Sequence, residues 1–478
     1  MEKTIEADIE IIKINRPYID LVELRLDKLD DPLAVHPDIV KLKFGIPSII
    51  TYRKKIDGGN YEGSEIYRRS VLYEYSKTEF NYIDLEMETS FSEVERSCEE
   101  NGITIIRSYH NFLKVPDNLE EIIRHLSSIR GEIAKVAVYP GSSSETFKLF
   151  EVFKKVKDIK DKIILGMGVF GLPTRILYKK IGSLITFCSG TNNSGAPGQL
   201  SPVEMKNLYQ GDKIRDNTSI FGIIGNPVMH SRSPGLHNKA YKRANIDAVY
   251  IPFLVDNIKS FLQLAKLLGI DGFSVTVPYK IDILKFLDEK SPEINSIHSC
   301  NTVLKRGAFW KGFNTDFNGF LKPLLSVVDA SKLKNCAVIG AGGASRAVIA
   351  ALKSIDVEVS IFNRSVKRAS KLAEETSSFF YPITRVDLLH EFDLIVQTTS
   401  VGMIPLDNET PLPEYKFKAG QIVYDVIYTP LKTKLLKDAE EAGAVIIGGM
   451  EMLNTQGIEQ FEIFMNQPYP LEEQKENS

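Results

Sequence analysis

Residues 338–346 read Val-Ile-Gly-Ala-Gly-Gly-Ala-Ser-Arg, a glycine-rich turn between two runs of small or apolar residues. The run before the turn, 335–339, predicts a strand, and the run after it, 344–351, predicts the start of a helix. Glycines let the backbone approach a pyrophosphate, and the N-terminus of a helix presents free N–H groups to an anion. We therefore expect a nucleotide-binding βαβ unit. The expected cofactor contacts in the turn are Gly340, Ala341, Gly342, Gly343 and Ala344.

The second predicted strand of this unit decides between two cofactors. Ser345 occupies the third glycine position of the G-x-G-x-x-G pattern, so the turn alone is a weak signal. An NAD site places an acid after the next strand to bind the ribose hydroxyls. Here the strand 357–362 leads into two arginines, which suit a 2′-phosphate and predict NADP(H); the alternative is a helix-capping turn flanked by surface arginines. The further cofactor contacts predicted are Asn363, Arg364, Ser365 and Arg368.

The bulk properties are those of a globular protein with several domains. With 478 residues, 43% of them hydrophobic and 25% charged, the chain should form two or three domains. The formal charge of −3 favours neither nucleic acid nor a membrane surface as a partner, and no apolar run approaches the length of a membrane span. The scattered cysteines and the lack of a signal-peptide pattern predict a reduced, cytoplasmic protein. The cysteines are Cys98, Cys188, Cys300 and Cys336.

The first 208 residues alternate β-rich runs with amphipathic helical stretches, which predicts a (β/α)8 barrel in an α/β protein. Seven strands are predicted, and the eighth should precede residue 19, where only the charged segment 2–13 is found. The barrel therefore either begins short or has a poorly formed first strand. The predicted strands are 19–26, 47–53, 82–87, 103–108, 133–139, 162–167 and 183–187.

Four boundaries follow from these patterns. The barrel should span 1–208, and the polar stretch 209–219 should be a linker. A second β/α pattern begins at residue 220. It divides into a substrate-binding domain, formed by 220–320 and 450–478, and a Rossmann-like nucleotide-binding domain, 321–449.

Polar residues in the second half gather at the ends of predicted strands. Ser231 and Ser233 follow such an end and could bind a small carboxylate or equally cap a helix. In 273–280, apolar Phe, Val and Val alternate with polar residues, which places Thr276 on the polar face. Lys280 lies just beyond the end of this strand, where α/β sheets bind ligands.

These motifs closely resemble the shikimate dehydrogenase family from about residue 220 to 465. The family pattern includes Gly-Asn-Pro, Ser-x-Ser-Pro, Thr-Val-Pro-x-Lys, Asn-Thr-Asp and a terminal Gly-Met-x-Met-Leu-x-x-Gln, and all occur here in order. The resemblance implies reduction of 3-dehydroshikimate with NADPH by a catalytic pair, Lys280 and Asp316. It also implies a cofactor contact at Gly449. The substrate contacts that it implies are Ser231, Ser233, Thr276, Asn301, Tyr428 and Gln456.

Charged residues in the first half occupy predicted strands. Glu23, Arg25 and Asp27 share one face of a strand, which indicates either a barrel mouth or a solvated edge. Lys135 lies inside an apolar strand and His110 ends the strand before it. A buried lysine is costly unless it is paired or functional, and desolvation favours its nucleophilic amine.

This constellation resembles type I 3-dehydroquinate dehydratase over about residues 17–205. The matching motifs are Glu-Leu-Arg-x-Asp (23–27), Thr-Tyr-Arg (51–53), Tyr-Ile-Asp-Leu-Glu (82–86), Ser-Tyr-His-Asn-Phe (108–112), Ala-Lys-Val-Ala (134–137) and Ala-Pro-Gly-Gln (196–199). The resemblance implies an iminium on Lys135, proton transfer by His110 and no cofactor or metal. It assigns the carboxylate to Arg175 and Gln199. It assigns the ring hydroxyls to Glu23, Arg25 and Arg53.

Two positions depart from the dehydratase pattern. Asp57 stands where the family usually has a glutamate near the histidine, and Gly195 stands where a serine is common. The triple serine 142–144 could suggest a phosphate site, but we interpret it as a loop and N-cap before a helix at Glu145.

Together the two resemblances predict two consecutive reactions of the shikimate pathway on one chain, with the product of the first as the substrate of the second. Three alternatives stay open from the sequence. The chain could be a metabolite sensor that kept both folds, which the retained Lys135, His110, Lys280 and Asp316 disfavour. It could be a quinate-preferring dehydrogenase that uses NAD; the two arginines disfavour NAD, and the choice between quinate and shikimate stays open. One of the two sites, the dehydratase above all, could be inactive.

Overall fold

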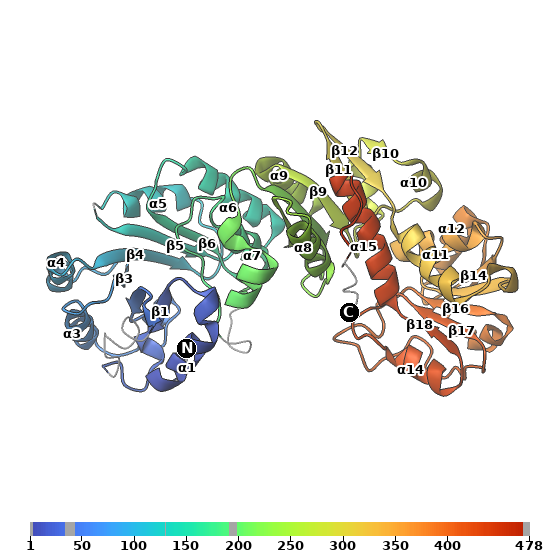
Figure 1. The fold of residues 1–478 in the computed structure, drawn as a ribbon, viewed down its shortest axis with the longest axis horizontal. Helices are drawn as coiled ribbons and strands as arrows, with labels where there is room; N and C mark the ends of the chain where they lie inside the picture. The colour runs from blue at the N-terminus through green and yellow to red at the C-terminus, as the bar shows by residue number, and fades with distance from the viewer. Residues whose placement is uncertain (1–2, 34–43, 130, 191–197, 472–478) are drawn as a thin grey trace, which may run out of the picture. The chain divides into compact units, whose positions relative to one another are not determined.

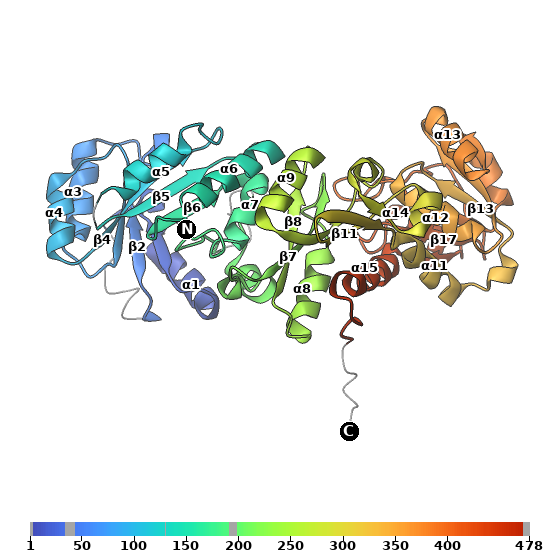
Figure 2. The same ribbon diagram turned by 90° about the horizontal axis from the view of Figure 1, so that it is seen from above.

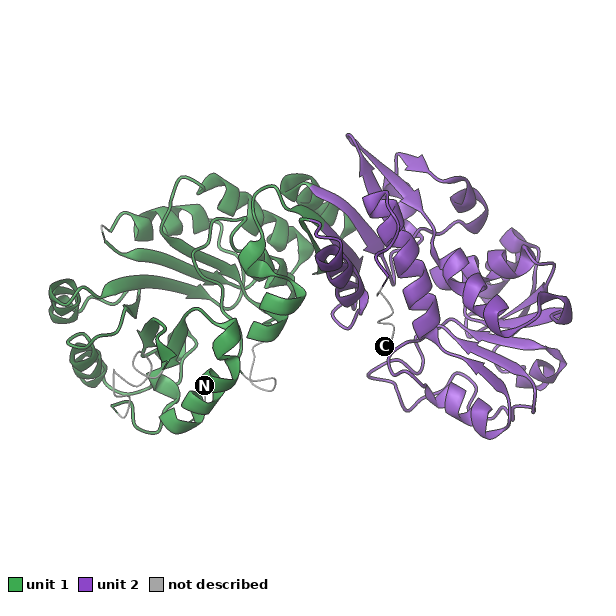
Figure 3. Ribbon diagram, viewed as in Figure 1, with its two compact units in different colours: residues 1–220, 247–269 green, residues 221–246, 270–478 purple. Residues whose placement is uncertain are grey.

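The computed structural model describes residues 3–33, 44–129, 131–190 and 198–471. The described chain divides into two compact units (Figure 3). Unit 1 comprises 1–220 and 247–269, and unit 2 comprises 221–246 and 270–478.

Unit 1 is built on a parallel sheet whose strand order follows the chain, β1-β2-β3-β4-β5-β6. The sheet is curled, with helices α3 to α6 along its outer side (Figures 1 and 2). This arrangement agrees with the α/β architecture predicted for this half. The strands are β1 (Val22–Arg25), β2 (Ser48–Thr51), β3 (Tyr82–Glu86), β4 (Thr104–Asn111), β5 (Ile133–Val138) and β6 (Lys162–Gly166). The helices are α1 (Ile5–Asn15), α3 (Glu65–Tyr75), α4 (Ser92–Glu100), α5 (Leu119–Ser127), α6 (Ser143–Lys155) and α7 (Gly168–Ile176).

The structure explains the missing first strand of the predicted barrel and corrects one predicted strand. The segment where an eighth strand was sought forms helix α1, capped by Thr4 and buried through apolar residues such as Ile5, Ile9 and Ile12. The predicted strand 183–187 is not a regular strand, although Leu184 N–H donates to the Lys162 carbonyl at 2.9 Å. Within the described ranges the sheet therefore has six strands.

The segment 247–269 belongs to unit 1 because it packs on α6 and α7. It contains β8 (Ala248–Leu254) and α9 (Ile258–Leu268). Ser143 and Asp256 exchange hydrogen bonds, each backbone N–H donating to the other side chain at 2.9 and 3.0 Å. Ser142 caps α6, as the N-cap interpretation predicted, although the helix begins at Ser143 rather than Glu145.

The second sheet is mixed, in the order β10-β12-β11-β9-β7-β8, with β11 antiparallel to both of its neighbours. Its remaining strands are β7 (Ser219–Gly225), β9 (Ile270–Val275), β10 (Glu289–Lys290), β11 (Thr302–Arg306) and β12 (Phe309–Phe313). The associated helices are α8 (Ser233–Arg243), α10 (Pro292–Ile297), α11 (Asp316–Val327) and α15 (Gly449–Met465). Because β9 ends at Val275, Val277 does not share its buried face as predicted and is 57% exposed.

The third sheet is parallel in the order β15-β14-β13-β16-β17-β18, the doubly wound order of dinucleotide-binding folds. Separate apolar clusters cover its two faces, one around Val348 and Phe320 and the other around Leu435 and Leu389. The strands are β13 (Asn335–Ile339), β14 (Glu358–Asn363), β15 (Phe379–Pro382), β16 (Leu394–Gln397), β17 (Ile422–Asp425) and β18 (Val445–Ile447). The helices are α12 (Gly343–Lys353), α13 (Val366–Thr376) and α14 (Lys434–Glu441).

The described helices include none with the length and hydropathy needed to cross a membrane. All four cysteines are free thiols; Cys98, Cys300 and Cys336 are buried, whereas Cys188 is only partly buried.

Candidate active sites

Lys135 lies in the middle of β5 with only 4% of its surface exposed, as its apolar neighbours in the sequence predicted. Its Nζ donates to Asp84 Oδ2 at 2.8 Å and lies 3.5 Å from Glu23 Oε1. The ammonium also lies 4.5 Å from the centre of the Phe187 ring. This lysine is therefore buried, held by two carboxylates and stacked on an aromatic face.

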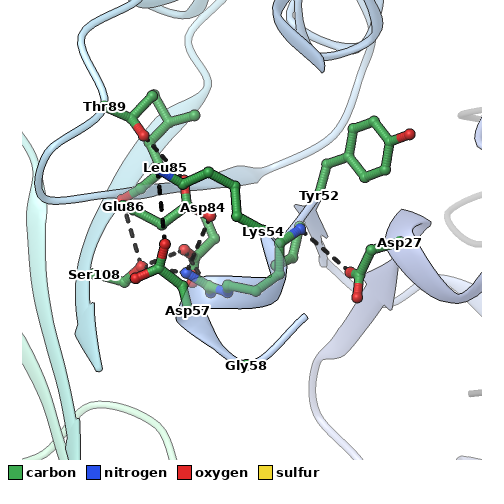
Figure 4. Close-up of polar contacts among 12 residues, drawn as sticks. Asp27, Tyr52, Lys54, Asp57, Gly58, Asp84, Leu85, Glu86, Thr89 and Ser108 are labelled. Carbon is green, nitrogen blue, oxygen red and sulfur yellow. Dashed lines mark hydrogen bonds and ion pairs between the residues drawn. The ribbon is translucent and has the colours of Figure 1, made fainter. Parts of the chain in front are cut away.

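Asp84 is the centre of the charge network around this lysine. Besides Lys135, it accepts from Ser108 Oγ at 2.6 Å and lies 2.7 Å from Arg53 Nη2. Burial disfavours the charged carboxylate, but Arg53 and Lys135 outweigh burial and lower the pKa of Asp84 well below its usual range. Figure 4 shows Asp84 and Ser108 meeting in one group of polar contacts.

Glu23 and Arg25 lie at the end of β1 beside this network. Thr51 Oγ1 donates to Glu23 Oε1 at 2.8 Å. Burial opposes ionisation of Glu23, yet Lys135 and Arg25 lower its pKa below the ordinary value. Arg25 binds Asp27 through two nitrogens, at 2.9 and 2.8 Å. The barrel-mouth interpretation of these charges is thus consistent with the structure, because Glu23 contacts Lys135 and the side chain of Asp27, paired with Arg25, is buried.

His110 ends β4 next to the lysine strand, and its Nδ1 is buried without a hydrogen-bond partner among the described residues. Burial lowers the pKa of this imidazole well below 6.5, and the cations Arg53 and Lys135 lower it further. The ring is therefore neutral at physiological pH and able to accept a proton. Asp57 forms an ion pair with Lys54 at 3.7 Å, and no described contact joins it to His110.

Arg175 is 3% exposed and donates to the Phe187 carbonyl at 3.1 Å, while its Nε has no partner in the described chain. Burial lowers the pKa of its guanidinium to about 10, so it stays charged at neutral pH. A buried cation with no ion pair in the described ranges is suited to an anionic ligand. Gln199 lines a cavity of about 360 Å³ together with Glu23 and Arg25. Gly195 and the first two residues of 196–199 lie outside the described residues.

Lys280 and Asp316 meet in unit 2, where Lys280 Nζ donates to Asp316 Oδ2. Their side chains are 15% and 5% exposed. Asn301 Nδ2 donates to Asp316 Oδ1 at 2.9 Å and lies 3.3 Å from Gln456 Oε1. Four residues predicted from separate motifs are thus brought together. Lys280 lies in the loop after β9, Asn301 directly precedes β11, Asp316 begins α11 and Gln456 lies on α15.

The serines after β7 face the loop after β17. Burial raises the pKa of the Tyr428 phenol, and a hydrogen bond with Ser231 partly offsets this rise. Ser233 is buried at the start of α8, and its backbone N–H donates to Ser231 Oγ at 3.2 Å. Ser231 therefore both caps a turn and faces Tyr428, so the two interpretations of this motif are compatible. Thr276 is partly buried, and its backbone N–H donates to the Ile224 carbonyl.

The glycine turn has the predicted strand–turn–helix setting, between β13 and α12. Gly340 adopts φ +116°, a conformation that favours glycine, and an added Cβ would lie 2.5 Å from Thr398 Oγ1. Ser345, at the third glycine position, is buried and bonds both Gly342 N–H and Thr398. A Cβ on Gly343 would lie 2.7 Å from Lys280 Cβ, so the glycine turn borders Lys280.

The predicted phosphate-binding arginines follow β14. Asn363 donates to the Ser365 carbonyl at 3.0 Å, and Ser365 caps α13. Arg364 and Arg368 are exposed, and neither forms an ion pair with the described part of the chain. Both cations are thus available to an anion. Gly449 begins α15, where a Cβ would lie 2.3 Å from the Val426 carbonyl oxygen.

Three family models match the chain in the order of these sites. They are type I 3-dehydroquinase at residues 1–216, the shikimate dehydrogenase substrate-binding domain at 223–303, and shikimate/quinate 5-dehydrogenase at 324–412. A bifunctional 3-dehydroquinate dehydratase/shikimate dehydrogenase of Arabidopsis thaliana is 37% identical over 97% of this chain and 80% of its own length. This chain belongs to the same bifunctional family.

Several shikimate dehydrogenases are similar to the second half alone. One of Bacillus mycoides, named as NADP+-dependent, is 41% identical over 51% of this chain and 92% of its own length. A crystal structure of the Aquifex aeolicus enzyme is 37% identical with a TM-score of 0.51, covering 54% of this chain and 96% of that one. A shikimate dehydrogenase solved with NADP+ is 37% identical with a TM-score of 0.50, and the match covers 54% of this chain and 93% of that one.

Sequence reasoning missed three residues of the first site. Asp84 and Ser108 were quoted only as parts of motifs, although Asp84 contacts Lys135 directly. Arg68 was not singled out at all; it is fully buried on α3 and pairs with Glu86 at 2.8 Å. An arginine inside the amphipathic segment 65–75 was the only signal, and such residues are usually solvated.

Proposed function

We propose that the chain catalyses two consecutive reactions, dehydration of 3-dehydroquinate to 3-dehydroshikimate and NADPH-dependent reduction of that product to shikimate. The observation that carries the first activity is the buried Lys135, held between Asp84 and Glu23. The observation that carries the second is the Lys280–Asp316 pair beside the nucleotide turn. We assign the first reaction to 1–208 and the second to 220–478, in the cytoplasm.

In the dehydratase site, Lys135 Nζ attacks the substrate ketone and forms an iminium after loss of water. The iminium accepts the electron pair that is released when the neighbouring carbon loses its proton. His110, kept neutral by burial and by adjacent cations, takes this proton and then gives it to the departing hydroxyl, which leaves as water. Water then hydrolyses the product iminium, which releases 3-dehydroshikimate and restores the Lys135 amine. Arg175 and Gln199 bind the substrate carboxylate, and Glu23, Arg25 and Arg53 bind ring hydroxyls.

In the reductase site, the glycine turn at Gly340 together with Arg364 and Arg368 would hold NADPH, which would supply the hydride for the ketone of 3-dehydroshikimate. Lys280 donates a proton to the oxygen as charge develops, and Asp316 keeps the lysine oriented and charged. Asn301 holds the other oxygen of Asp316 and also donates to Gln456, and both amides bind the substrate. The hydroxyls of Ser231, Ser233, Thr276 and Tyr428 surround the rest of the substrate.

One coupled assay tests both activities. The protein is given 3-dehydroquinate and NADPH, and absorbance of the enone and of NADPH is followed together. We expect NADPH consumption without added dehydratase. Enone accumulation without NADPH consumption would remove the reductase activity, and no change at either wavelength would favour a sensor without catalysis. Repeating the assay with quinate and NAD+ tests a quinate-preferring enzyme.

The pH dependence of dehydration should reflect the lowered pKa of His110. A histidine of ordinary pKa would lose about three quarters of its neutral form at pH 6. Because burial and the neighbouring cations lower this pKa, the neutral base persists to lower pH. We expect kcat/KM for dehydration at pH 6 to stay close to its value at pH 7. An acid limb centred near pH 6.5 would show that His110 titrates normally and contradict this expectation.

Cofactor preference should depend on the arginines after β14. The Arg364→Ala/Arg368→Ala variant should raise the KM for NADPH about 10- to 100-fold, because charge-assisted hydrogen bonds to the 2′-phosphate are lost. Activity with NADH should change little. Lys371→Ala, an exposed cation further along α13, is the matched control. An equal loss with both cofactors would place the two arginines outside phosphate recognition.

A further inference from the structure

A second layer of buried charges lies behind the Schiff-base site. Arg68, on α3, is fully buried, and Glu86 ends β3 with 3% exposure. Arg68 Nη1 donates to Glu86 Oε2 at 2.8 Å and to the Tyr52 carbonyl at 3.0 Å. Nη2 of the same arginine donates to Thr89 Oγ1 at 3.1 Å, and Thr89 donates in turn to Glu86. Glu86 is therefore fixed from two sides.

This layer connects to the catalytic lysine through Arg53. Arg53 Nη1 lies 3.7 Å from Glu86 Oε1, and its Nη2 lies 2.7 Å from Asp84 Oδ1. The other oxygen of Asp84 accepts from Lys135 at 2.8 Å. Charges of alternating sign thus run from Arg68 through Glu86, Arg53 and Asp84 to Lys135. Figure 4 shows Glu86, Asp84 and Ser108 in one group of contacts, with Thr89 beside it.

Because the charges alternate in sign along this chain of contacts, Glu86 can influence Lys135 through Arg53 and Asp84. Arg53 is shared between two carboxylates, so Glu86 pairs with one terminal nitrogen of its guanidinium while Asp84 binds the other. The cations Arg68, Arg53 and Lys135 face the buried anions Glu86, Asp84 and Glu23, and Arg68 also binds the more exposed Glu65 on its own helix at 2.9 Å. Removing one anion from such a buried set leaves an uncompensated positive charge close to the amine.

We propose that Glu86 and Arg68 are positioning residues for the dehydratase reaction: they hold Arg53, which sets Asp84 against Lys135. Neither residue needs to touch the substrate, because both act through Arg53. The inference rests on the proposed dehydratase function. It adds Glu86 on β3 and Arg68 on α3 to the residues that position the amine of Lys135.

Glu86→Gln tests the role, because the amide keeps the shape of the side chain but removes its charge. At temperatures at which the Glu86→Gln variant is folded, we expect its kcat/KM for dehydration to be at least tenfold lower than that of the wild-type protein. We also expect the pH profile of borohydride trapping on Lys135 to move to lower pH, because loss of a nearby negative charge favours the uncharged amine. NADPH-dependent reduction should be unchanged. Glu86→Asp, which retains the charge, should keep the wild-type pH profile while losing part of the rate.

Glu132→Gln is the matched control. Glu132 forms a buried ion pair with Arg107 at 2.6 Å, on the neighbouring strand β4, and that pair is not joined to Lys135 by any described ion pair. It should lower the melting temperature as Glu86→Gln does, without moving the trapping profile. If Glu86→Gln does not fold, Arg68→Lys takes its place: it keeps the positive charge but loses the forked donors that fix Glu86 and Thr89, so kcat/KM for dehydration should fall while the trapping profile stays in place. Wild-type kcat/KM and an unmoved profile in the folded variant would overturn the proposal. Absence of dehydration in the wild-type protein would instead refute the proposed function.

Discussion

Lys135→Met should abolish dehydration of 3-dehydroquinate while leaving NADPH-dependent reduction of 3-dehydroshikimate intact. A methionine fills the space of the lysine but has no amine to form an iminium, so the route that stores the released electron pair is lost. Loss of a covalent nucleophile costs about 10⁴-fold or more in rate. Enone formation measures the first activity, and reduction by the same preparation reports that the chain is folded.

Lys135→Met removes a positive charge as well as an amine, so a second variant is needed to separate the two effects. The methionine leaves Asp84 and Glu23 without the cation that they share, and breaking a buried pair costs about 3–5 kcal/mol. Lys135→Arg keeps a positive charge against both carboxylates but cannot form an iminium, since its guanidinium is not deprotonated in proteins. Both variants should be inactive, and the arginine variant should be the more stable of the two.

Borohydride trapping identifies the reacting amine. With 3-dehydroquinate present, reduction should leave a mass adduct on Lys135 that survives denaturation. Lys162 supplies an internal comparison, because it is also a buried lysine, but its Nζ donates to the Ile159 carbonyl and not to a carboxylate. Dehydration by a protein that carries no adduct on Lys135 would rule out the iminium route.

The sequence predicted the chemical groups of both sites better than their supports. Lys135 was visible because a lone cation interrupts an apolar strand. Asp84 was hidden because it stands in a short alternating run, where a polar residue is ordinarily solvent-facing. Arg68 on α3 was missed for a different reason. Its partners Glu86 and Thr89 lie 18 and 21 residues further along the chain, at and just after the end of β3. Such contacts follow from tertiary packing and leave no local periodicity.

Errors in the predicted strands have a similar cause. The segment 183–187 is rich in apolar and β-branched residues, but its backbone joins β6 through the bond from Leu184 N–H to the Lys162 carbonyl and forms no ladder. Val277 continues the alternation of β9 although the strand has already ended at Val275. The alternation of apolar and polar residues predicts which face of a strand each side chain lies on. Where the strand ends depends instead on the neighbouring strand to which its backbone is hydrogen-bonded. The glycine turn was predicted more completely because its strand, turn and helix are contiguous in the chain.

Lys280→Met should abolish reduction of 3-dehydroshikimate while leaving both NADPH binding and dehydration intact. The lysine donates to Asp316 and borders the nucleotide turn through Gly343, so it lies between the cofactor turn and the substrate groups. Removal of a proton donor costs about 10²–10⁴-fold in rate. Loss of the ammonium also removes stabilisation of the developing alkoxide, which places the expected effect at the upper end of this range.

Cofactor binding separates this chemical effect from a collapsed site. Asp316 keeps its hydrogen bond from Asn301 when Lys280 is replaced, so the start of α11 should remain in place. The variant should therefore bind NADPH with unchanged Kd, measured by fluorescence. Lys285→Met is the matched control, because Lys285 is a 72% exposed cation on the next turn whose ion pair within the described ranges is with Asp282. Reduction by Lys280→Met at more than about a tenth of the wild-type kcat would remove this lysine from proton transfer, because a positioned general acid contributes more than that.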